Sequence, residues 1–233
     1  ADVVLSAVTA AQGVEAAKSM ASHLQRDAFF LDLNSVSPGA KQQAAALIEA
    51  AGGRYVEAAI MSPIGPRRIA SPILFGGPHA AAFLPLAREL GFEGARVFSD
   101  QIGRASAAKM CRSAVVKGIE ALLAESLLTA RRHGVEDAVI ESLQSLFPAE
   151  NWRSFARYMM SRSLIHGRRR AEEMREVART VAEAGLEPWM SNAGAKRQDW
   201  AAQFHESAAH EELLPMLDSI LTGMCNGQEG SRC

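Results

Sequence analysis

The chain has 233 residues, which allows one large domain or two smaller ones, since domains usually contain about 100–200 residues. Its 25 basic and 26 acidic side chains give a net charge of −1, so the chain has no general electrostatic attraction to nucleic acid or to an anionic membrane surface. Three cysteines without metal-ligand spacing, no apolar run of about 20 residues and no signal peptide predict a soluble cytoplasmic protein without a disulfide framework, a metal or a membrane span.

The first hundred residues alternate short apolar runs with helix-forming stretches. Strands are predicted at 1–8, 28–31, 54–61, 71–75 and 95–98, and helices at 13–24, 38–51 and 80–90. Ser37, just before Pro38, is the expected N-cap of the second helix. This alternation predicts an α/β domain with a mostly parallel sheet and crossover helices.

From Gly103 the pattern becomes almost wholly helical. Residues 104–133 contain no proline and keep an apolar face, which predicts one helix of ~45 Å at ~1.5 Å per residue. Further helices are predicted at 135–146, 151–163, 168–184, 187–209 and 211–221, with a disordered, glycine-rich tail over 223–233. An all-α domain therefore follows the α/β domain, with the boundary near residue 100.

The chain opens directly on an apolar strand, and no Gly-x-Gly-x-x-Gly separates a strand from a helix. A buried opening strand needs an outer neighbour, and an α/β sheet needs more strands than these. We therefore expect the chain to be the latter part of a longer protein.

Lys109 stands at the head of the long predicted helix, among Ala105, Ala107, Ala108 and Met110. Ammonium groups rarely enter apolar surroundings unpaired, and a cation in the first turn of a helix opposes the helix dipole. These residues leave two interpretations open: a solvated lysine at the helix start, or a proton carrier whose pKa is lowered by partial burial.

Several motifs occur in an order that resembles the β-hydroxyacid dehydrogenase superfamily, which includes 6-phosphogluconate and 3-hydroxyisobutyrate dehydrogenases. The similarity rests on Asp32-Leu-Asn-Ser-Val-Ser-Pro-Gly39, the Glu57-Ala58 strand, Gly103 to Lys109, Gly118 and His166 to Met174. The second half is most similar to the 6-phosphogluconate-dehydrogenase-like C-terminal domain of a less characterised branch.

The resemblance implies the following organisation. Residues 1–100 would be the C-terminal part of a Rossmann-like NAD(P)-binding domain, 101–222 a helical substrate and dimerisation domain, and 223–233 a tail. The dinucleotide loop would precede Ala1, and a long helix would join the two domains. The cofactor would be NAD or NADP, and the protein would form a homodimer through its helical domain.

The resemblance also assigns roles to residues. Lys109 would take the proton from a hydroxyacid substrate, including a phosphorylated or sugar acid, while hydride passes to the nicotinamide, and it would serve again if decarboxylation follows. Val8, Thr9 and Asn34 would contact the cofactor. As an N-terminal neighbour of a helix, Asn34 could equally serve in capping.

Two departures from the family pattern affect substrate binding. Met61-Ser62-Pro63 stands where the family has Ser-Gly-Gly, with Ser62 able to compensate in part, and Ser113 stands where asparagine is usual. Ser113 lies one helical turn after Lys109, so both side chains share a helix face.

Arg169 is the third predicted substrate contact. It lies within the basic run 168–170, beside His166, where an arginine fork could bind a carboxylate or phosphate. Such a run is more often a solvated face.

Two other functions stay open on these residues. The altered Met61-Ser62-Pro63 segment also suits a non-catalytic dimerisation or binding module derived from the fold. An imine-reductase-like enzyme is the weaker alternative, because such enzymes usually lack the lysine.

Overall fold

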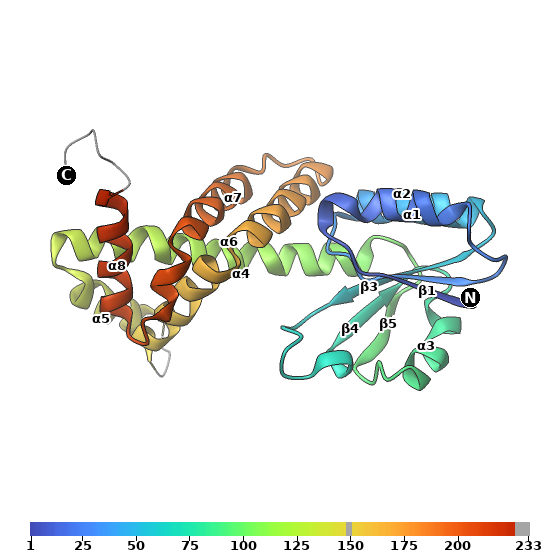
Figure 1. Ribbon diagram of the computed structural model, residues 1–233, viewed down its shortest axis with the longest axis horizontal. Helices are drawn as coiled ribbons and strands as arrows, with labels where there is room; N and C mark the ends of the chain where they lie inside the picture. The colour runs from blue at the N-terminus through green and yellow to red at the C-terminus, as the bar shows by residue number, and fades with distance from the viewer. Residues whose placement is uncertain (148–150, 227–233) are drawn as a thin grey trace. The chain divides into compact units, whose positions relative to one another are not determined.

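The computed structural model describes residues 1–147 and 151–226 (Figure 1). The strands are β1 (Val3–Ser6), β2 (Phe29–Asp32), β3 (Arg54–Ile60), β4 (Ile73–Gly76) and β5 (Ala95–Ser99). The helices are α1 (Gly13–Ala21), α2 (Pro38–Ala50), α3 (Ala80–Glu89), α4 (Arg104–His133), α5 (Glu136–Leu146), α6 (Trp152–Glu183), α7 (Trp189–Ala201) and α8 (Leu213–Asn226). The predicted α/β region followed by an all-helical region is confirmed.

The five strands form one sheet in the order β1-β2-β3-β4-β5. All neighbouring pairs are parallel except β3 and β4, which are antiparallel, so the sheet is mostly parallel as predicted. The register pairs Ser6 with Asp32 and Asp32 with Glu57. Three polar side chains therefore lie in a row across three parallel strands, at the carboxyl ends of β1 and β2 and in the middle of β3.

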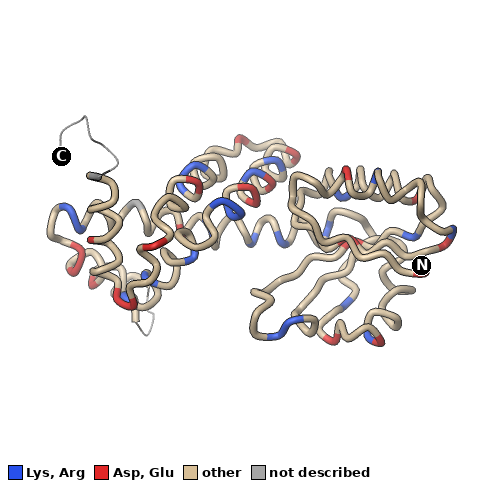
Figure 2. Tube along the Cα trace, in the orientation of Figure 1, with Lys and Arg blue, Asp and Glu red and all other residues tan. Residues whose placement is uncertain are grey.

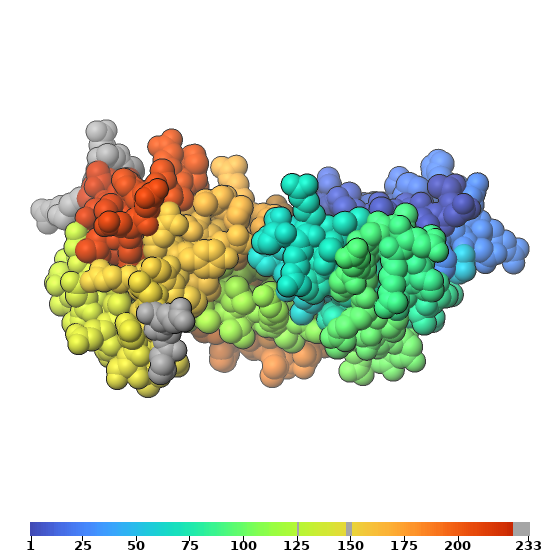
Figure 3. Space-filling model, turned by 90° about the horizontal axis from the view of Figure 1, so that it is seen from below, coloured from blue at the N-terminus to red at the C-terminus, as the bar shows by residue number. Residues whose placement is uncertain are grey.

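Both faces of the sheet are covered, because side chains alternate along each strand. On one face, Phe30 and Tyr55 pack with Ala44 and Ile48 of α2 and with residues of α1. On the other face, β-strand residues pack against Phe83 and its neighbours in α3. Figure 1 shows α1 and α2 on one side of the sheet and α3 on the other, and Figure 3 views the molecule from the α3 side.

The chain divides into two compact units that differ from a simple N-terminal and C-terminal half. The sheet unit consists of residues 1–114 together with 175–188, and the helical unit contains residues 115–174 and the chain from 189 onward. Helices α4 and α6 each run from one unit into the other without a break. Residues 175–188, at the end of α6, thus belong to the sheet unit.

The helical unit has its own apolar core, which draws residues from α4, α5, α6, α7 and α8, including Leu127, Met160, Ala201 and Met216. It also buries charge. Arg170 forms an ion pair with Glu120, to which the Gln198 amide also donates at 3.2 Å. Along the helices of this unit, Figure 2 shows basic and acidic residues interspersed.

Three predicted helix boundaries are wrong. The separate helices expected at 151–163 and 168–184 are the single helix α6, in which Gly167 lets the backbone of Gln198 approach within 2.4 Å of the position a Cβ would occupy. The helix expected over 187–209 ends at Ala201 and continues as a 3-10 segment (Ala202–Ala209) with non-helical dihedrals at Phe204.

The remaining correction concerns the tail. Residues 223–226, expected to be disordered, form the last turn of α8, and 227–233 lie outside the described residues. No helix within the described ranges is long and apolar enough to cross a membrane.

Candidate active site

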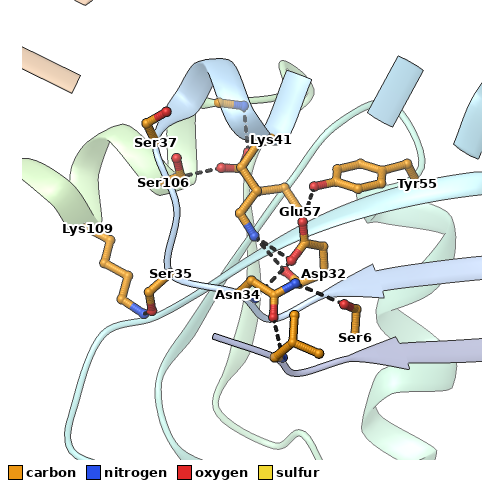
Figure 4. Close-up of polar contacts among 12 residues, drawn as sticks. Ser6, Asp32, Asn34, Ser35, Ser37, Lys41, Tyr55, Glu57, Ser106 and Lys109 are labelled. Carbon is orange, nitrogen blue, oxygen red and sulfur yellow. Dashed lines mark hydrogen bonds and ion pairs between the residues drawn. The ribbon is translucent and has the colours of Figure 1, made fainter. Parts of the chain in front are cut away.

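Asp32 is the centre of a buried polar network at the carboxyl end of β2 (Figure 4). One carboxylate oxygen, Oδ1, accepts from Lys41 Nζ at 2.9 Å and from the Asn34 backbone N–H at 2.9 Å. The other oxygen, Oδ2, accepts from the Tyr55 hydroxyl at 2.6 Å. Burial, followed by the charge of Asp32, raises the pKa of Tyr55, so its hydroxyl remains a donor. Asp32 thereby fixes the start of the loop between β2 and α2.

Asn34 connects this loop to the chain that follows β1. Its Nδ2 donates to Ser6 Oγ at 2.9 Å, and its Oδ1 accepts from the Val8 backbone N–H at 2.7 Å. Thr9 follows Val8 and is exposed. The three residues predicted to contact the cofactor thus meet at the carboxyl ends of two adjacent parallel strands, while their roles stay predictions.

Lys109 reaches the same loop from α4. Its Nζ donates to Ser35 Oγ at 2.6 Å, and its side chain is half-buried (Figure 4). Because Ser35 directly follows Asn34, the predicted proton carrier lies next to the predicted cofactor loop.

Glu57 sets the position of α4. Its carboxylate is fully buried and accepts from two backbone N–H groups: that of Gly103, just before α4, at 2.7 Å, and that of Ser106, in the first turn of α4, at 2.6 Å. Gly76 makes room for this carboxylate, since a Cβ there would lie 2.5 Å from Glu57 Oε2. Lys109 follows one turn after Ser106. Glu57, a residue of β3, therefore fixes the position of the helical turn that precedes Lys109.

The pKa of Glu57 reflects opposing effects. Burial is the largest and raises it, while the nearby Lys41 and the two backbone N–H groups lower it. The net direction is upward from the ordinary value for a glutamate.

The three predicted substrate residues are placed differently. Ser113 is buried on α4, one turn after Lys109. Ser62 lies on the loop after β3, and its hydroxyl donates to the carbonyl of Pro63 at 3.2 Å. Arg169 belongs to the helical unit, where its exposed guanidinium pairs with Glu173 at 2.5 Å. Of the three, Ser113 is the one placed on the same helix as Lys109.

Sequence reasoning missed Lys41, Tyr55 and Glu57. A signal was present for two of them. Glu57 is the one charged residue in the run 55–60, and Lys41 shares its helix face with the apolar residues three, four and seven positions later. A charged residue at a buried position of an apolar pattern implies a buried partner.

Comparison with known proteins identifies relatives of similar architecture. A family model described as a domain of unknown function, DUF1932, matches residues 130–201. A conserved hypothetical protein from Sinorhizobium meliloti 1021 is 37% identical, with a TM-score of 0.76 over 95% of this chain and 75% of that one.

A second solved structure is the conserved protein MTH1747, of unknown function, described as structurally similar to 3-hydroxyacid dehydrogenases. It is 34% identical, with a TM-score of 0.70 over 87% of this chain and 76% of that one.

More distant structures share the fold. Mycobacterium tuberculosis 3-hydroxyisobutyrate dehydrogenase, solved with L-serine, is 19% identical with a TM-score of 0.62 over 95% of this chain and 79% of that one. Psf3, solved in complex with NADP+ and 2-OPP, is 16% identical with a TM-score of 0.60 over 95% and 80% of the two chains.

Proposed function

Because the chain belongs to the 3-hydroxyacid dehydrogenase-like family, of which the DUF1932 segment is the C-terminal domain, we propose that it serves an NAD(P)-dependent oxidation of a hydroxyacid. The observation that carries the proposal is the 2.6 Å contact between Lys109 Nζ and Ser35 Oγ. It brings an amine capable of proton transfer to the loop at the carboxyl ends of β1 and β2. Open α/β sheets bind their ligands outside this edge.

Exposed residues at this edge support cofactor binding in the proposal. Val8 and Thr9 are exposed where the chain leaves β1, and the Asn34 amide holds that segment against the end of β2. In the proposal these three residues hold the nicotinamide end of NAD or NADP. The bound nicotinamide supplies the hydride acceptor.

Lys109 acts as general base in this proposal. Its neutral Nζ takes the proton of the substrate hydroxyl while the C–H bond of the same carbon is broken, and the C–O bond becomes a carbonyl. Ser35 holds Nζ in place by accepting one of its hydrogens. Where the product is a β-keto acid that loses its carboxyl group, the Lys109 ammonium returns the proton to the enol carbon.

Ser113, Ser62 and Arg169 remain proposed substrate contacts. Ser113 is one turn from Lys109 on α4, which supports a contact near the reacting hydroxyl. Ser62 and Arg169 are proposed to bind acidic groups of the substrate, including a phosphate or a sugar-acid carboxylate.

The test is the Lys109→Ala variant of the full-length protein, assayed with a panel of 3-hydroxyacids and both nicotinamide cofactors. We expect turnover to fall by ~10²-fold or more, since general-base catalysis contributes about 10²–10⁴-fold. Cofactor affinity should persist, measured by fluorescence titration.

Lys18→Ala, at an exposed lysine of α1, is the matched control and should retain full turnover. Undiminished turnover in Lys109→Ala would remove Lys109 from the mechanism.

A non-catalytic binding module is the second candidate, favoured by Met61-Ser62-Pro63 in place of the family's Ser-Gly-Gly. The same cofactor titration separates the two, because such a module predicts no saturable binding of NAD or NADP by the full-length protein. The imine-reductase-like alternative is disfavoured by the presence of Lys109.

A further inference from the structure

The N-cap of α2, Ser37, lies two residues beyond Ser35, and the backbone donors of this helix start are bound by side chains of the protein. The N–H of Ser37 donates to Glu176 Oε2 at 2.8 Å, and that of Gly39 donates to Glu183 Oε2 at 3.1 Å. The N–H of Ala40 donates to Ser37 Oγ at 3.3 Å, which confirms Ser37 as the predicted N-cap. Pro38 has no N–H to donate. This helix start therefore offers these donors to two carboxylates and a hydroxyl of its own chain rather than to an anionic ligand.

Both carboxylates come from the end of α6, more than 130 residues later in the sequence and within the same compact unit. Glu176 is buried at 3% exposure and is also paired with Arg179. Glu183 additionally accepts from the Ser37 hydroxyl at 2.9 Å. Gly39 permits this approach, because a Cβ at that position would lie 2.7 Å from Glu183 Oε1. Two carboxylates thus hold one helix start.

The loop that carries Asn34 and Ser35 is consequently fixed at both ends. At its beginning, Asp32 accepts from the Asn34 N–H, and at its end α6 holds Ser37. Ser35 lies between these anchors and contacts Lys109. A shift of either anchor would move the Ser35 hydroxyl relative to Nζ.

We infer that Glu176 and Glu183 are positioning residues, through which the end of α6 sets the Ser35 loop against Lys109. This inference rests on the proposed function for its catalytic consequence but not for its geometry. An acidic residue of α6 would then influence proton transfer without touching substrate or cofactor.

The test measures the reactivity of Lys109 directly, by competitive acetylation of amines followed by peptide mass spectrometry. Glu176→Leu removes the acceptor of the Ser37 N–H and thereby loosens the loop. The hydrogen bond from Lys109 Nζ to Ser35 Oγ, which favours the charged form of the Lys109 amine, is then weakened. We expect Lys109 to be acetylated about threefold faster. In the full-length enzyme, kcat should fall about tenfold with little change in KM.

Glu176→Gln keeps a side-chain oxygen for Ser37 and should restore labelling and kcat to near the wild-type values. Glu172→Leu, at an exposed position one turn earlier on α6, is the matched control and should leave both unchanged. An unchanged rate of Lys109 acetylation in folded Glu176→Leu would overturn the inference.

If Glu176→Leu does not fold, Glu183→Ala decides the question, since Glu183 is exposed. It should accelerate Lys109 acetylation in the same direction, and an unchanged rate would again overturn the inference. The labelling result is independent of turnover. Full activity in Lys109→Ala would therefore reject the proposed catalytic role of Lys109 while leaving this geometric result in place.

Discussion

At the residue scale, the most consequential side chain outside the proposed chemistry is Lys41. It is fully buried, and its Nζ contacts both the carboxylate and the backbone carbonyl of Asp32 at 2.9 Å. A buried pair is costly to break, because the partner left behind is an uncompensated charge.

Replacement of Lys41 by methionine keeps most of the side-chain volume and removes the charge. We expect the free energy of unfolding to fall by about 3–5 kcal/mol, measured by urea denaturation. The exposed Lys18→Met variant should change it by less than about 0.5 kcal/mol. A loss below about 1 kcal/mol in Lys41→Met would mean that Asp32 does not depend on this partner.

At the element scale, the link between β3 and α4 depends on one carboxylate. Glu57 accepts from two N–H groups at the start of α4, one just before the helix and one in its first turn, and burial raises its pKa. A carboxyl group whose pKa is higher in the folded state favours folding in its protonated form. Its contribution to stability is thus complete below the ordinary glutamate pKa of 4.5 and is lost as the pH rises through the raised pKa of the folded state.

The pH dependence of stability should therefore distinguish wild type from Glu57→Gln, which does not titrate. As the pH falls from about 7 to about 5, the free energy of unfolding of the wild type should rise relative to that of Glu57→Gln. Denaturant titrations of both proteins at the two pH values measure this shift. Glu15→Gln, at an exposed site in the first turn of α1, should show no comparable shift. A shift in the opposite direction for Glu57→Gln would contradict the raised pKa.

The same scale shows how far the sequence predicts the elements. Strands, crossover helices and the long α4 follow from apolar periodicity and from glycine stops, such as Gly134 with a φ of +68°. The continuity of α6 through Gly167 cannot be predicted from these signals. Gly167 is needed because the backbone of Gln198, in another helix, approaches it closely. Local patterns cannot reveal a packing partner.

At the scale of the whole molecule, the homodimer through the helical region stays a prediction. Val115 and Leu122 of α4 are 64% and 57% exposed and lie seven residues apart, on one side of the helix. Tyr158 and Ile165 of α6 show the same spacing and are also exposed. Exposed apolar stripes of this kind are typical of subunit interfaces.

Combined Val115→Asp and Leu122→Asp substitution should convert the dimer to a monomer, measured by sedimentation velocity over a range of protein concentrations. Leu90→Asp, at an exposed leucine of the sheet unit, should leave the association unchanged. A wild-type protein that is monomeric at all concentrations would contradict the prediction.

The candidate site, like the elements, was predicted only in part. The resemblance pointed to Lys109 and Asn34. The structure places Asn34 in the loop after β2, and Lys109 binds Ser35, the next residue of that loop. The sequence signals that Lys41 and Glu57 are buried charges, but it does not identify their partners. The contact of Glu176 with Ser37 could not be predicted, because the two residues are 139 positions apart in the sequence.

The division of the sheet unit into two chain segments has a consequence for synthesis. Residues 1–114 leave the ribosome first, and residues 175–188 follow only after the intervening part of the helical unit. Domains generally form as the chain emerges, the N-terminal one first. The Ser35 loop is therefore made early, but Glu176 and Glu183 reach it late. A nascent chain stalled before residue 175 would carry the strands, the loop and Lys109, and would still lack the two carboxylates that bind Ser37 and Gly39 at the end of that loop.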